Sequence, residues 1–478
     1  MEKERATSNI MEAPAYWKEY PDRDIEFVRW YPCSVLPLSE EEVWKKKTLS
    51  FYCHIPFCNN NCLSCLYNKF GTKDGFVHQY LETLKKEVLN YASRPYIQDR
   101  EIIAGYIGGG TPTVLKLEQL KDLLVFLSEH LNIKKGAHLT VETTPLDIDE
   151  EKAELLLQHG ISRISLGVQS FDGKLLERIG RAQTGDCAKG VIAMLRKAGF
   201  KEINIDIMYG LPGETMEMWK DTVEQVLSIP IESISLYFYI LIPFSPLYMK
   251  IVNGVVPPCP PVEMADEMCN YAVKKLLSSG FTAITTMDFA RISPDEKGIN
   301  FYNLGTEKYR GAVVTSVPRL AYPAHTWYEC EEMLAFGSGA YGYLKKHTYL
   351  NDPDINEYMR KINGGELPVV MGAEVTSKER IAMSLVYGTK LLKVLRKDFK
   401  DRHGVDMLQV YGKQIKQLEE WGLIKMTDEA LEVTYPKGWY YMDNISKMFF
   451  TPENYKIPQP QITNVSLLKY LKKQKKEV

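Results

Sequence analysis

The chain has 478 residues, of which 45 % are hydrophobic, so its length predicts two or three domains with substantial apolar cores. A formal net charge of −2 argues against a general nucleic-acid binder, whose affinity rests on a strongly basic face. The charged N-terminus lacks the apolar core of a signal peptide, and no apolar run is long enough to span a membrane, so we expect a cytoplasmic protein.

Residues 1–48 form an expected N-terminal arm. This segment interleaves charged residues with aromatic ones, such as Trp17 and Trp30. It cannot bury a core by itself, so we expect an irregular arm on the surface of the domain that follows. Packing across the mouth of that domain is the alternative.

A cluster of cysteines follows this arm: four of the nine cysteines lie within residues 51–70. Cys58, Cys62 and Cys65 have the spacing C-x3-C-x2-C on a loop after a β-prone run that Pro56 ends. A zinc site needs four ligands, whereas three thiolates suit a four-iron, four-sulfur cluster with one iron left free. A disulfide framework suits a short secreted chain, whereas this chain is long and we predict no secretory signal. We expect Cys53, on the preceding strand, to be a packed and unreactive thiol.

The motif YCHIPFC at 52–58, continued by the two later cysteines, resembles the signature of radical S-adenosylmethionine (SAM) enzymes. More narrowly, it resembles the oxygen-independent coproporphyrinogen III oxidase group, which also contains haem chaperones and radical methyltransferases. The resemblance implies that Cys58, Cys62 and Cys65 hold a [4Fe-4S] cluster and that Tyr52 and His54 help to bind the cofactors. The free iron would bind SAM, and reductive cleavage would give a 5′-deoxyadenosyl radical that abstracts hydrogen.

Residues 49–255 are expected to form an α/β domain, because short β-prone runs alternate with helical stretches. The predicted strands are 49–55, 103–108, 137–142, 162–167, 202–207 and 233–239. Amphipathic helices are predicted between them, for example at 75–93 and 149–158. Six βα units match the incomplete, TIM-like (β/α)6 barrel of radical SAM enzymes, whose lateral opening admits a sizeable substrate.

The second predicted strand ends in Gly108, Gly109, Gly110 and Thr111. Glycines let the backbone approach a ligand closely, and their N–H groups can bind a carboxylate or an adenine edge. A plain tight turn is the alternative interpretation. The resemblance implies that this segment holds the amino group of SAM.

Polar residues stand at or beyond the ends of the next three strands, and the resemblance gives each of them a role. Glu142 would contact the methionine or ribose part of SAM, and Gln169 matches a glutamine of the family. Arg181 would meet the SAM carboxylate, which suits a guanidinium group. Asp206 points into the barrel, where an unpaired carboxylate is costly, and matches a catalytic aspartate near the cofactors. A solvated carboxylate and a surface arginine are the alternatives for Glu142 and Arg181.

Aromatic residues close the sixth predicted strand. Alternation along a strand places Tyr237 and Tyr239 on one face and Phe238 on the other. Most aromatic residues in strands belong to the core, but one of these two tyrosines is a candidate to line a cavity.

Residues 256–372 are expected to extend the barrel and to link it to the next domain. A proline-rich linker at 257–261 precedes a predicted helix at 262–279, and a glycine turn follows a late strand in LAFGSGAYGYL. His325 is a candidate substrate or haem ligand, with a solvated loop histidine as the alternative.

Residues 373–450 predict a small helical, winged-helix-like domain that serves as a lid rather than a DNA reader. We expect helices at 377–396 and 405–421, a stop at Gly422, two short strands and another helix. Residues 451–478 would form a tail that ends in a basic amphipathic helix.

Two residues depart from the coproporphyrinogen oxidase pattern. Tyr67 stands two positions after the third ligand, where those oxidases carry a further cysteine. Ser64 stands where they place an aromatic residue that borders a second SAM molecule. Both departures weaken the case for porphyrinogen decarboxylation.

The sequence therefore favours a radical methyltransferase, or a related SAM enzyme, that acts on a conjugated or tetrapyrrole-like substrate. Reductive haem breakdown is one of the reactions that this hypothesis covers. Coproporphyrinogen III decarboxylation is the second hypothesis, and a haem-binding chaperone is the third. The expected cofactors are one [4Fe-4S] cluster and one or two SAM molecules. The expected partners are a small molecule such as a tetrapyrrole or haem and a reducing protein such as flavodoxin or ferredoxin, without nucleic acid.

Overall fold

The computed structural model describes residues 48–60, 62–65, 69–243, 245–291 and 332–452. The expectations for the N-terminal arm, Tyr67, His325 and nearly all of the tail lie outside these residues.

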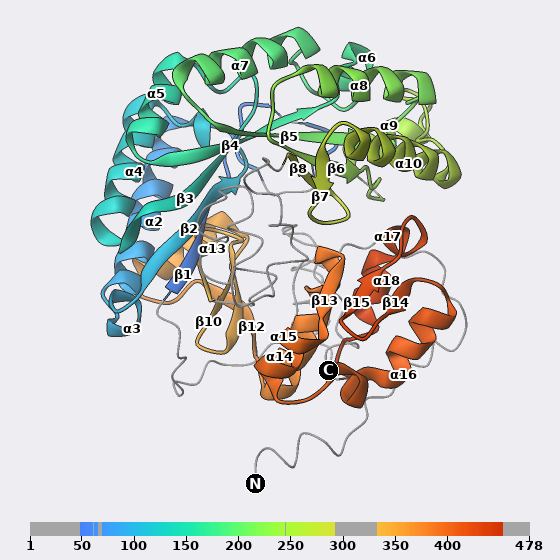
Figure 1. Ribbon diagram of the computed structural model, residues 1–478. Helices are drawn as coiled ribbons and strands as arrows, with labels where there is room; N and C mark the ends of the chain where they lie inside the picture. The colour runs from blue at the N-terminus through green and yellow to red at the C-terminus, as the bar shows by residue number, and fades with distance from the viewer. Residues whose placement is uncertain (1–47, 61, 66–68, 244, 292–331, 453–478) are drawn as a thin grey trace.

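A twelve-stranded sheet forms the centre of the molecule (Figure 1), in the order β12-β11-β10-β9-β1-β2-β3-β4-β5-β6-β8-β7. Its central run consists of the six predicted strands, which are all parallel. They are β1 (Thr48–Ile55), β2 (Glu101–Gly109), β3 (Ile133–Thr143), β4 (Ile161–Gln169), β5 (Glu202–Tyr209) and β6 (Ser233–Phe238). The predicted α/β fold with an open, incomplete barrel is confirmed.

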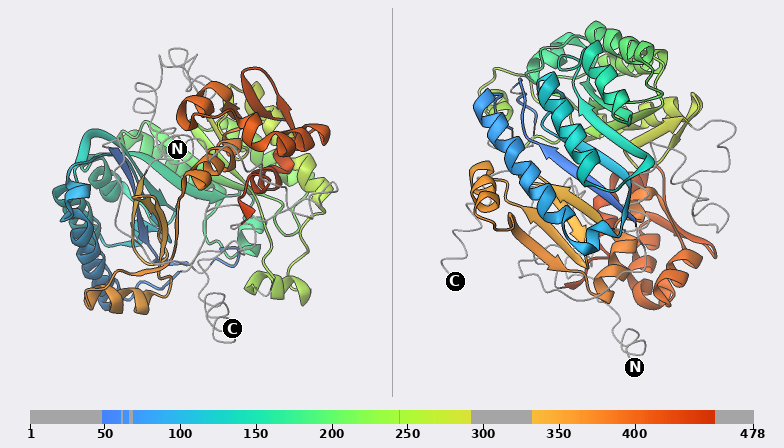
Figure 2. Two further views of the ribbon diagram at one scale, coloured as in Figure 1. Left: turned by 90° about the horizontal axis from the view of Figure 1, so that it is seen from below. Right: turned by 90° about the vertical axis from the view of Figure 1, so that its left-hand side faces the viewer.

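Helices between these strands cover the outer face of the sheet, which the turned views in Figure 2 also show. They are α2 (Asp74–Ala92), α3 (Pro95–Gln98), α4 (Leu117–His130), α5 (Glu150–Gln158), α6 (Gly173–Arg178), α7 (Gly185–Ala198) and α8 (Met216–Ser228). In α2, Val77, Leu81, Leu84 and Val88 recur at helical spacing and are all buried. These apolar stripes pack on the strands and leave the carboxyl ends of the strands for the site.

The sheet continues beyond the predicted strands at both edges. Beside β6 lie β8 (Asp288–Arg291) and β7 (Phe281–Ala283), both antiparallel to their neighbours. Beside β1 lies the parallel strand β9 (Met333–Phe336), followed by the antiparallel β10 (Tyr341–Leu344), β11 (His347–Asn351) and β12 (Val369–Glu374). The expected late glycine turn follows β9, where Gly337 and Gly339 have φ of +100° and +74°.

Three further helices belong to this part of the chain: α9 (Pro246–Val252), α10 (Val262–Ser278) and α13 (Ile355–Asn363). The helix predicted at 262–279 is therefore confirmed as α10. Among the described residues, no helix is both long and apolar enough to cross a membrane.

The C-terminal domain combines helices with a small antiparallel sheet in the order β13-β15-β14. Its elements are α14 (Ser377–Val386), β13 (Lys393–Leu395), α15 (Arg396–His403), α16 (Met407–Glu420), β14 (Ile424–Met426), β15 (Ala430–Val433), α17 (Lys437–Tyr440) and α18 (Met442–Lys447). Gly422 follows α16 with φ of +69°, as a helix stop requires.

The single helix predicted at 377–396 is wrong. The observed helix α14 ends at Val386. Leu392 then adopts a left-handed φ of +68°, and the following strand β13 pairs with β15. The apolar run over these residues suits a buried strand as well as a helix, and pairing with β15 decides between them.

Candidate functional site

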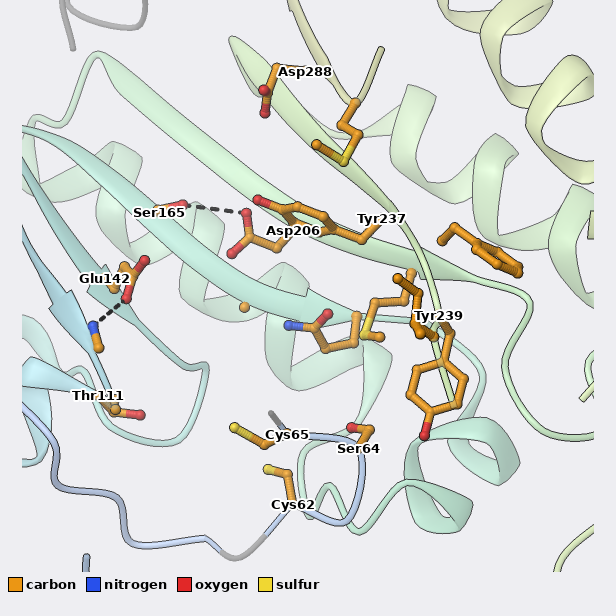
Figure 3. Close-up of a pocket in the computed structure, with 18 of the residues that line it drawn as sticks. Cys62, Ser64, Cys65, Thr111, Glu142, Ser165, Asp206, Tyr237, Tyr239 and Asp288 are labelled. Carbon is orange, nitrogen blue, oxygen red and sulfur yellow. Dashed lines mark hydrogen bonds between the residues drawn. The ribbon is translucent and has the colours of Figure 1, made fainter. Parts of the chain in front are cut away.

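One cavity of 670 Å³ lies between the carboxyl ends of the central strands, the β9–β10 turn and the C-terminal domain. Its volume is within the range of small-molecule sites. Of the predicted site residues, all but Gly108 line it: Tyr52, His54, Cys58, Cys62, Cys65, Gly109, Gly110, Thr111, Glu142, Gln169, Arg181 and Asp206. Figure 3 shows the cysteine loop on one side and Asp206, Tyr237 and Asp288 on the other.

The cysteine loop is held at both ends by backbone hydrogen bonds. Cys58 N donates to Phe70 O at 3.0 Å, and Phe70 N donates to Pro56 O at 2.8 Å, which closes the loop. Leu63 N donates to Ile179 O at 2.9 Å, so the loop is also tied to the segment that leads to Arg181. These contacts hold the thiols at the end of β1, as the sequence predicts.

The three thiols lie close enough for their charges to interact, although they do not meet at one point. Burial raises the pKa of Cys58 to about 11, and a negative charge on Cys65 or Cys62 would raise it further. The Thr111 hydroxyl, 3.6 Å from the Cys58 sulfur, and the Lys69 ammonium oppose this rise. Over the described residues, no three His, Cys, Asp or Glu side chains converge as the ligands of a single ion do. Three separated thiols in one cavity fit an iron–sulfur cluster, in which each thiolate binds a different iron.

The glycine turn after β2 packs directly against β1 and the cysteine loop. Gly110 N donates to Ile55 O and Thr111 N to Phe57 O, both at 2.8 Å. A Cβ on Gly109 would lie 2.6 Å from the His54 ring, and one on Gly110 would lie 2.5 Å from Phe57 O. Gly109 also has φ of +114°, which side chains rarely adopt. Glycine is therefore required for this close approach, and the plain tight turn does not describe the segment.

Tyr52 and His54 lie on the cavity face of β1. The Tyr52 hydroxyl is 2.9 Å from His54 Nδ1, and the Tyr80 hydroxyl donates to the His54 carbonyl at 2.7 Å. Burial lowers the pKa of His54 to about 4, so its ring is neutral at pH 7. A neutral ring suits this buried position against the Gly109 backbone better than a charged imidazolium would.

Glu142 is engaged at both carboxylate oxygens. Gly109 N donates to Oε2 at 2.8 Å, and the Tyr106 hydroxyl donates to Oε1 at 2.9 Å. A Cβ on Gly108 would lie 2.6 Å from the same carboxylate, which explains this glycine although it does not line the cavity. Glu142 thus anchors the glycine turn from inside the sheet.

Gln169 and Arg181 converge above Gly167. Gln169 ends β4 with a left-handed φ of +69°, an uncommon conformation for a residue with a side chain, at a shift in the β4–β5 register. The Arg181 Nη1 donates to Gly167 O at 3.1 Å, whereas its buried Nε has no partner among the described residues. A backbone held in such a conformation beside a half-buried guanidinium is typical of a ligand-binding position.

Asp206 lies in a network of small polar residues on the inner face of the sheet. The Asn204 side-chain amide donates to Asp206 Oδ1 at 2.9 Å, and the Ser165 hydroxyl lies 3.4 Å from the same oxygen. Burial, followed by the charge of Glu142, raises the pKa of Asp206 to about 7. The carboxylate therefore faces the cavity with a proton affinity suited to acid–base chemistry.

The far wall of the cavity comes from residues that the sequence analysis did not single out. Aromatic and methionine side chains gather there: Met208, Tyr209, Met287, Met333, Tyr341, Tyr343, Met383, Tyr387, Trp439, Tyr440 and Met442. Asp288, on β8, also lines the cavity. Met208 and Tyr209 lie at the end of β5, whereas the others come from the segment before β8, from β9 and β10, and from the C-terminal part of the chain, so no single motif connects them in the sequence.

The aromatic residues at the end of β6 differ from the prediction. Tyr237, Phe238 and Tyr239 all line the cavity, because β6 ends at Phe238 and alternation stops there. Tyr237 is 39 % exposed, whereas Tyr239 is 4 % exposed and packs in a small cluster with Leu175 and Leu247. Tyr237 is therefore the more accessible of the two.

The described lining carries more carboxylates than cations. Its acidic residues are Glu142, Asp147, Asp206, Asp288 and Asp443, and its Lys and Arg residues are Lys69 and Arg181. Lys390 lies 3.1 Å from Asp443 and neutralises it.

Comparison with known proteins identifies the family. The Radical SAM superfamily model matches residues 52–226. The haem chaperone HemW of Bacillus subtilis (strain 168) is 30 % identical over 388 residues, which cover 81 % of this chain and 95 % of the chaperone. The chain belongs to the radical SAM superfamily. Members of this superfamily bind a [4Fe-4S] cluster and SAM, which are the cofactors of this chain as well.

Within the superfamily, the chain belongs to the group that contains HemW and the oxygen-independent coproporphyrinogen III oxidases. The oxidase of Pseudomonas aeruginosa is 26 % identical over 81 % of this chain and 82 % of its own length. The solved structure of coproporphyrinogen III oxidase (HemN) from Escherichia coli matches with a TM-score of 0.72 and 23 % identity, over 85 % of this chain and 91 % of that chain. The fold is therefore shared over most of both chains.

Proposed function

We propose that this radical SAM protein is an enzyme that modifies a conjugated, tetrapyrrole-like substrate by methyl transfer or by a related radical reaction such as reductive haem breakdown. The observation that carries the proposal is one cavity with the thiol loop at one end and an aromatic, methionine-rich wall at the other. A flat conjugated molecule suits such a wall, because aromatic faces stack and methionine side chains adapt their shape.

In this proposal, Cys58, Cys62 and Cys65 hold the cluster, and the residues from Gly109 to Thr111 lie beside it and bind SAM. The unpartnered Nε of Arg181 is a donor available to the SAM carboxylate. When bound, the cluster and SAM supply a 5′-deoxyadenosyl radical that abstracts hydrogen.

Glu142 has a different task from the one that the family resemblance implies. Its carboxylate accepts from Gly109 N and from the Tyr106 hydroxyl, so we assign it to shaping the glycine turn. Tyr52 supports the same surface through its contact with His54. These residues orient the SAM-binding backbone and keep it rigid.

The charge of the described lining favours a substrate with few carboxylates. If Arg181 binds SAM, Lys69 is the remaining Lys or Arg of this lining, so few cations are available to pair with substrate carboxylates. A propionate-rich porphyrinogen would find few cationic partners in this lining. The same argument disfavours decarboxylation of propionate groups there.

Two other functions have specific support. Coproporphyrinogen III oxidation is supported by the oxidase of Pseudomonas aeruginosa and by the fold of its Escherichia coli counterpart. Haem carriage without turnover is supported by the Bacillus subtilis chaperone, nearly all of whose length is matched. Ser64, which lines the cavity, leaves more room beside the thiols than an aromatic residue would, so we rank the oxidase lower.

Product analysis separates the three functions. The anaerobically reconstituted protein is incubated with methyl-labelled SAM, a low-potential reductant, and either haem or coproporphyrinogen III. Methyl transfer gives 5′-deoxyadenosine, S-adenosylhomocysteine and label in the tetrapyrrole, whereas haem breakdown gives 5′-deoxyadenosine and loss of haem. Carbon dioxide release without S-adenosylhomocysteine would identify the oxidase, and intact bound haem without 5′-deoxyadenosine would identify the chaperone. Either of these last two results would refute the proposal.

A further inference from the structure

Three carboxyl groups surround one guanidinium group on the inner face of the sheet. Glu142, Asp206 and Asp288 all lie within electrostatic range of Arg163. If all were ionised, three negative charges would face one positive charge inside the protein, which is unfavourable. A single proton shared within this cluster would relieve that repulsion.

The hydrogen bonds show where that proton does not reside. Glu142 accepts from the Gly109 N–H and from the Tyr106 hydroxyl, and two donors favour an ionised carboxylate. Asp206 also accepts from two donors, but both of them reach Oδ1, so its Oδ2 can carry the proton, and Asp288 lies within electrostatic range of it. Both line the cavity, and Figure 3 shows them on the same side of it, next to Tyr237.

Asp206 and Asp288 are linked across the sheet through one intervening strand. The register aligns Asp206 with Ser235 and Ser235 with Asp288, so the three residues form a row over β5, β6 and β8. Ser235 is hydrogen-bonded to Asp288, and the Asn204 amide donates to both Ser235 Oγ, at 3.2 Å, and Asp206 Oδ1, at 2.9 Å. This row connects the two carboxyl groups through buried polar side chains.

Asp288 is held firmly in place by its own turn. The Thr285 hydroxyl donates to Asp288 Oδ2 at 2.8 Å, and Asp288 N donates back to the same hydroxyl oxygen at 2.8 Å. Thr285 is 1 % exposed, so this turn is part of the packed interior. A carboxyl group fixed in this way keeps a constant distance from a bound substrate.

We propose that Asp206 and Asp288 form one acid unit that holds a single proton near neutral pH and donates it to the bound substrate. This inference rests on the proposed function, because it needs a substrate that gains electron density during the reaction. It makes Asp288 a catalytic residue in addition to Asp206. Burial raises the pKa of both groups, that of Asp206 to about 7, and the titration belongs to the pair rather than to either residue.

The proton transfer balances as follows. The substrate radical takes one electron from a low-potential one-electron donor of the flavodoxin or ferredoxin class, which gives an electron pair at a substrate atom. The carboxyl O–H bond then breaks, a C–H or N–H bond forms at that atom, and the acid unit becomes a carboxylate. The unit regains its proton from solvent.

The pH dependence has a definite sign. The unit must be protonated to donate, so the rate of product formation is full below the apparent pKa of the pair and falls as pH rises through it. The groups that face the pair are Glu142, Arg163, Tyr106 and Tyr237. The Asp288→Asn substitution removes a like charge, so the pKa of Asp206 falls. The alkaline limb of the pH–rate profile, where product formation declines, therefore moves to lower pH.

The test compares wild type with Asp288→Asn, Asp288→Glu and Asp443→Asn in anaerobic turnover over a pH series. Above neutral pH, we expect Asp288→Asn to lower product formation ~10–100-fold while 5′-deoxyadenosine formation persists, and Asp288→Glu to restore part of the rate. Asp443→Asn removes a carboxylate from the same cavity that Lys390 already neutralises, so its alkaline limb should stay at the wild-type pH. An alkaline limb at the same pH in Asp288→Asn and wild type would overturn the inference.

A second measurement does not depend on turnover. Infrared difference spectra of the protein over the same pH series should contain a protonated carboxyl band that disappears near pH 7 and is altered in Asp288→Asn. If wild type converts no tetrapyrrole, the proposed function fails, and this band alone decides whether the acid unit exists. Absence of this band throughout the pH series would overturn the inference.

Discussion

The two ends of the cavity are built in different ways. At the cofactor end, contiguous motifs on neighbouring parallel strands supply the residues, and backbone hydrogen bonds lock the cysteine loop to the glycine turn. At the substrate end, single residues from β6, β8, the β9–β10 turn and the C-terminal domain meet only after folding. The difference indicates that local motifs build the cofactor end, whereas long-range packing builds the end that we propose binds the substrate.

If this comparison holds, changes at the cofactor end should affect SAM binding or cleavage, and changes at the substrate end should affect only turnover of the substrate. The largest effect is expected at the cysteines. Replacing Cys58, Cys62 or Cys65 by Ala removes a cluster ligand, so iron content and the charge-transfer absorption of the reconstituted protein should be lost together with SAM cleavage.

Cys53 provides the matched control for this prediction. It is fully buried on β1, and burial raises its pKa far above the ordinary value, so its thiol stays protonated. Cys53→Ala should keep the cluster. Full SAM cleavage by Cys62→Ala would remove the basis of the cofactor assignment.

The next effect concerns the glycine turn. Gly109→Val would place a branched side chain against the His54 ring at a left-handed φ, so SAM binding should weaken by about 2–4 kcal/mol while the cluster survives. Equilibrium dialysis with labelled SAM under anaerobic conditions measures this change.

Gly160→Val separates backbone strain from the clash. Gly160 has φ of +78°, but no atom lies within 4 Å of an added Cβ. This variant should lose some stability and keep its affinity for SAM. Equal losses of affinity in both variants would show that the close approach to His54 is irrelevant.

Arg181→Ala should have a smaller effect on the same constant. Loss of a charge-assisted hydrogen bond to the SAM carboxylate predicts weakening by about 1–3 kcal/mol. Arg360→Ala, on the exposed surface of α13, is the control and should leave the dissociation constant unchanged. The role assigned to Arg181 fails if both variants bind SAM like wild type.

The smallest effect is expected at the substrate end. Tyr237→Leu removes an accessible aromatic face from the cavity, so the KM for the tetrapyrrole should rise by an amount equivalent to about 0.5–1.5 kcal/mol. Cleavage of SAM without substrate should not change. Tyr271→Leu, on the outer helix α10, is the control and should leave the KM for the tetrapyrrole unchanged. A change in the SAM affinity of Tyr237→Leu would contradict the division into two ends.

Much of this architecture could be predicted from the sequence, because the signals are local. The six central strands alternate with amphipathic helices. Cys58 follows β1, Gly109 ends β2 and Asp206 lies on β5, and the carboxyl ends of these strands meet at one edge of the sheet. The predicted residues therefore come together in one cavity. Their individual contacts with cluster and SAM remain predictions.

The rest could not be predicted, because it depends on pairing between distant segments. Asp288 lies on a four-residue strand that is defined only by its pairing with β6 and β7. The helix predicted at 377–396 was wrong for the same reason, since β13 exists through its pairing with β15. Similarly, the anchoring of Glu142 to Gly109 N is visible only once β2 and β3 lie side by side.

The most direct test of the account is the formation of 5′-deoxyadenosine with and without a tetrapyrrole. Anaerobically reconstituted protein receives SAM and reductant, and 5′-deoxyadenosine and the tetrapyrrole are quantified in the same samples. We predict that haem or a related conjugated tetrapyrrole raises 5′-deoxyadenosine formation above the substrate-free background, in proportion to the tetrapyrrole converted. Haem that stays bound and unchanged, with 5′-deoxyadenosine at background, would contradict the account and identify a carrier.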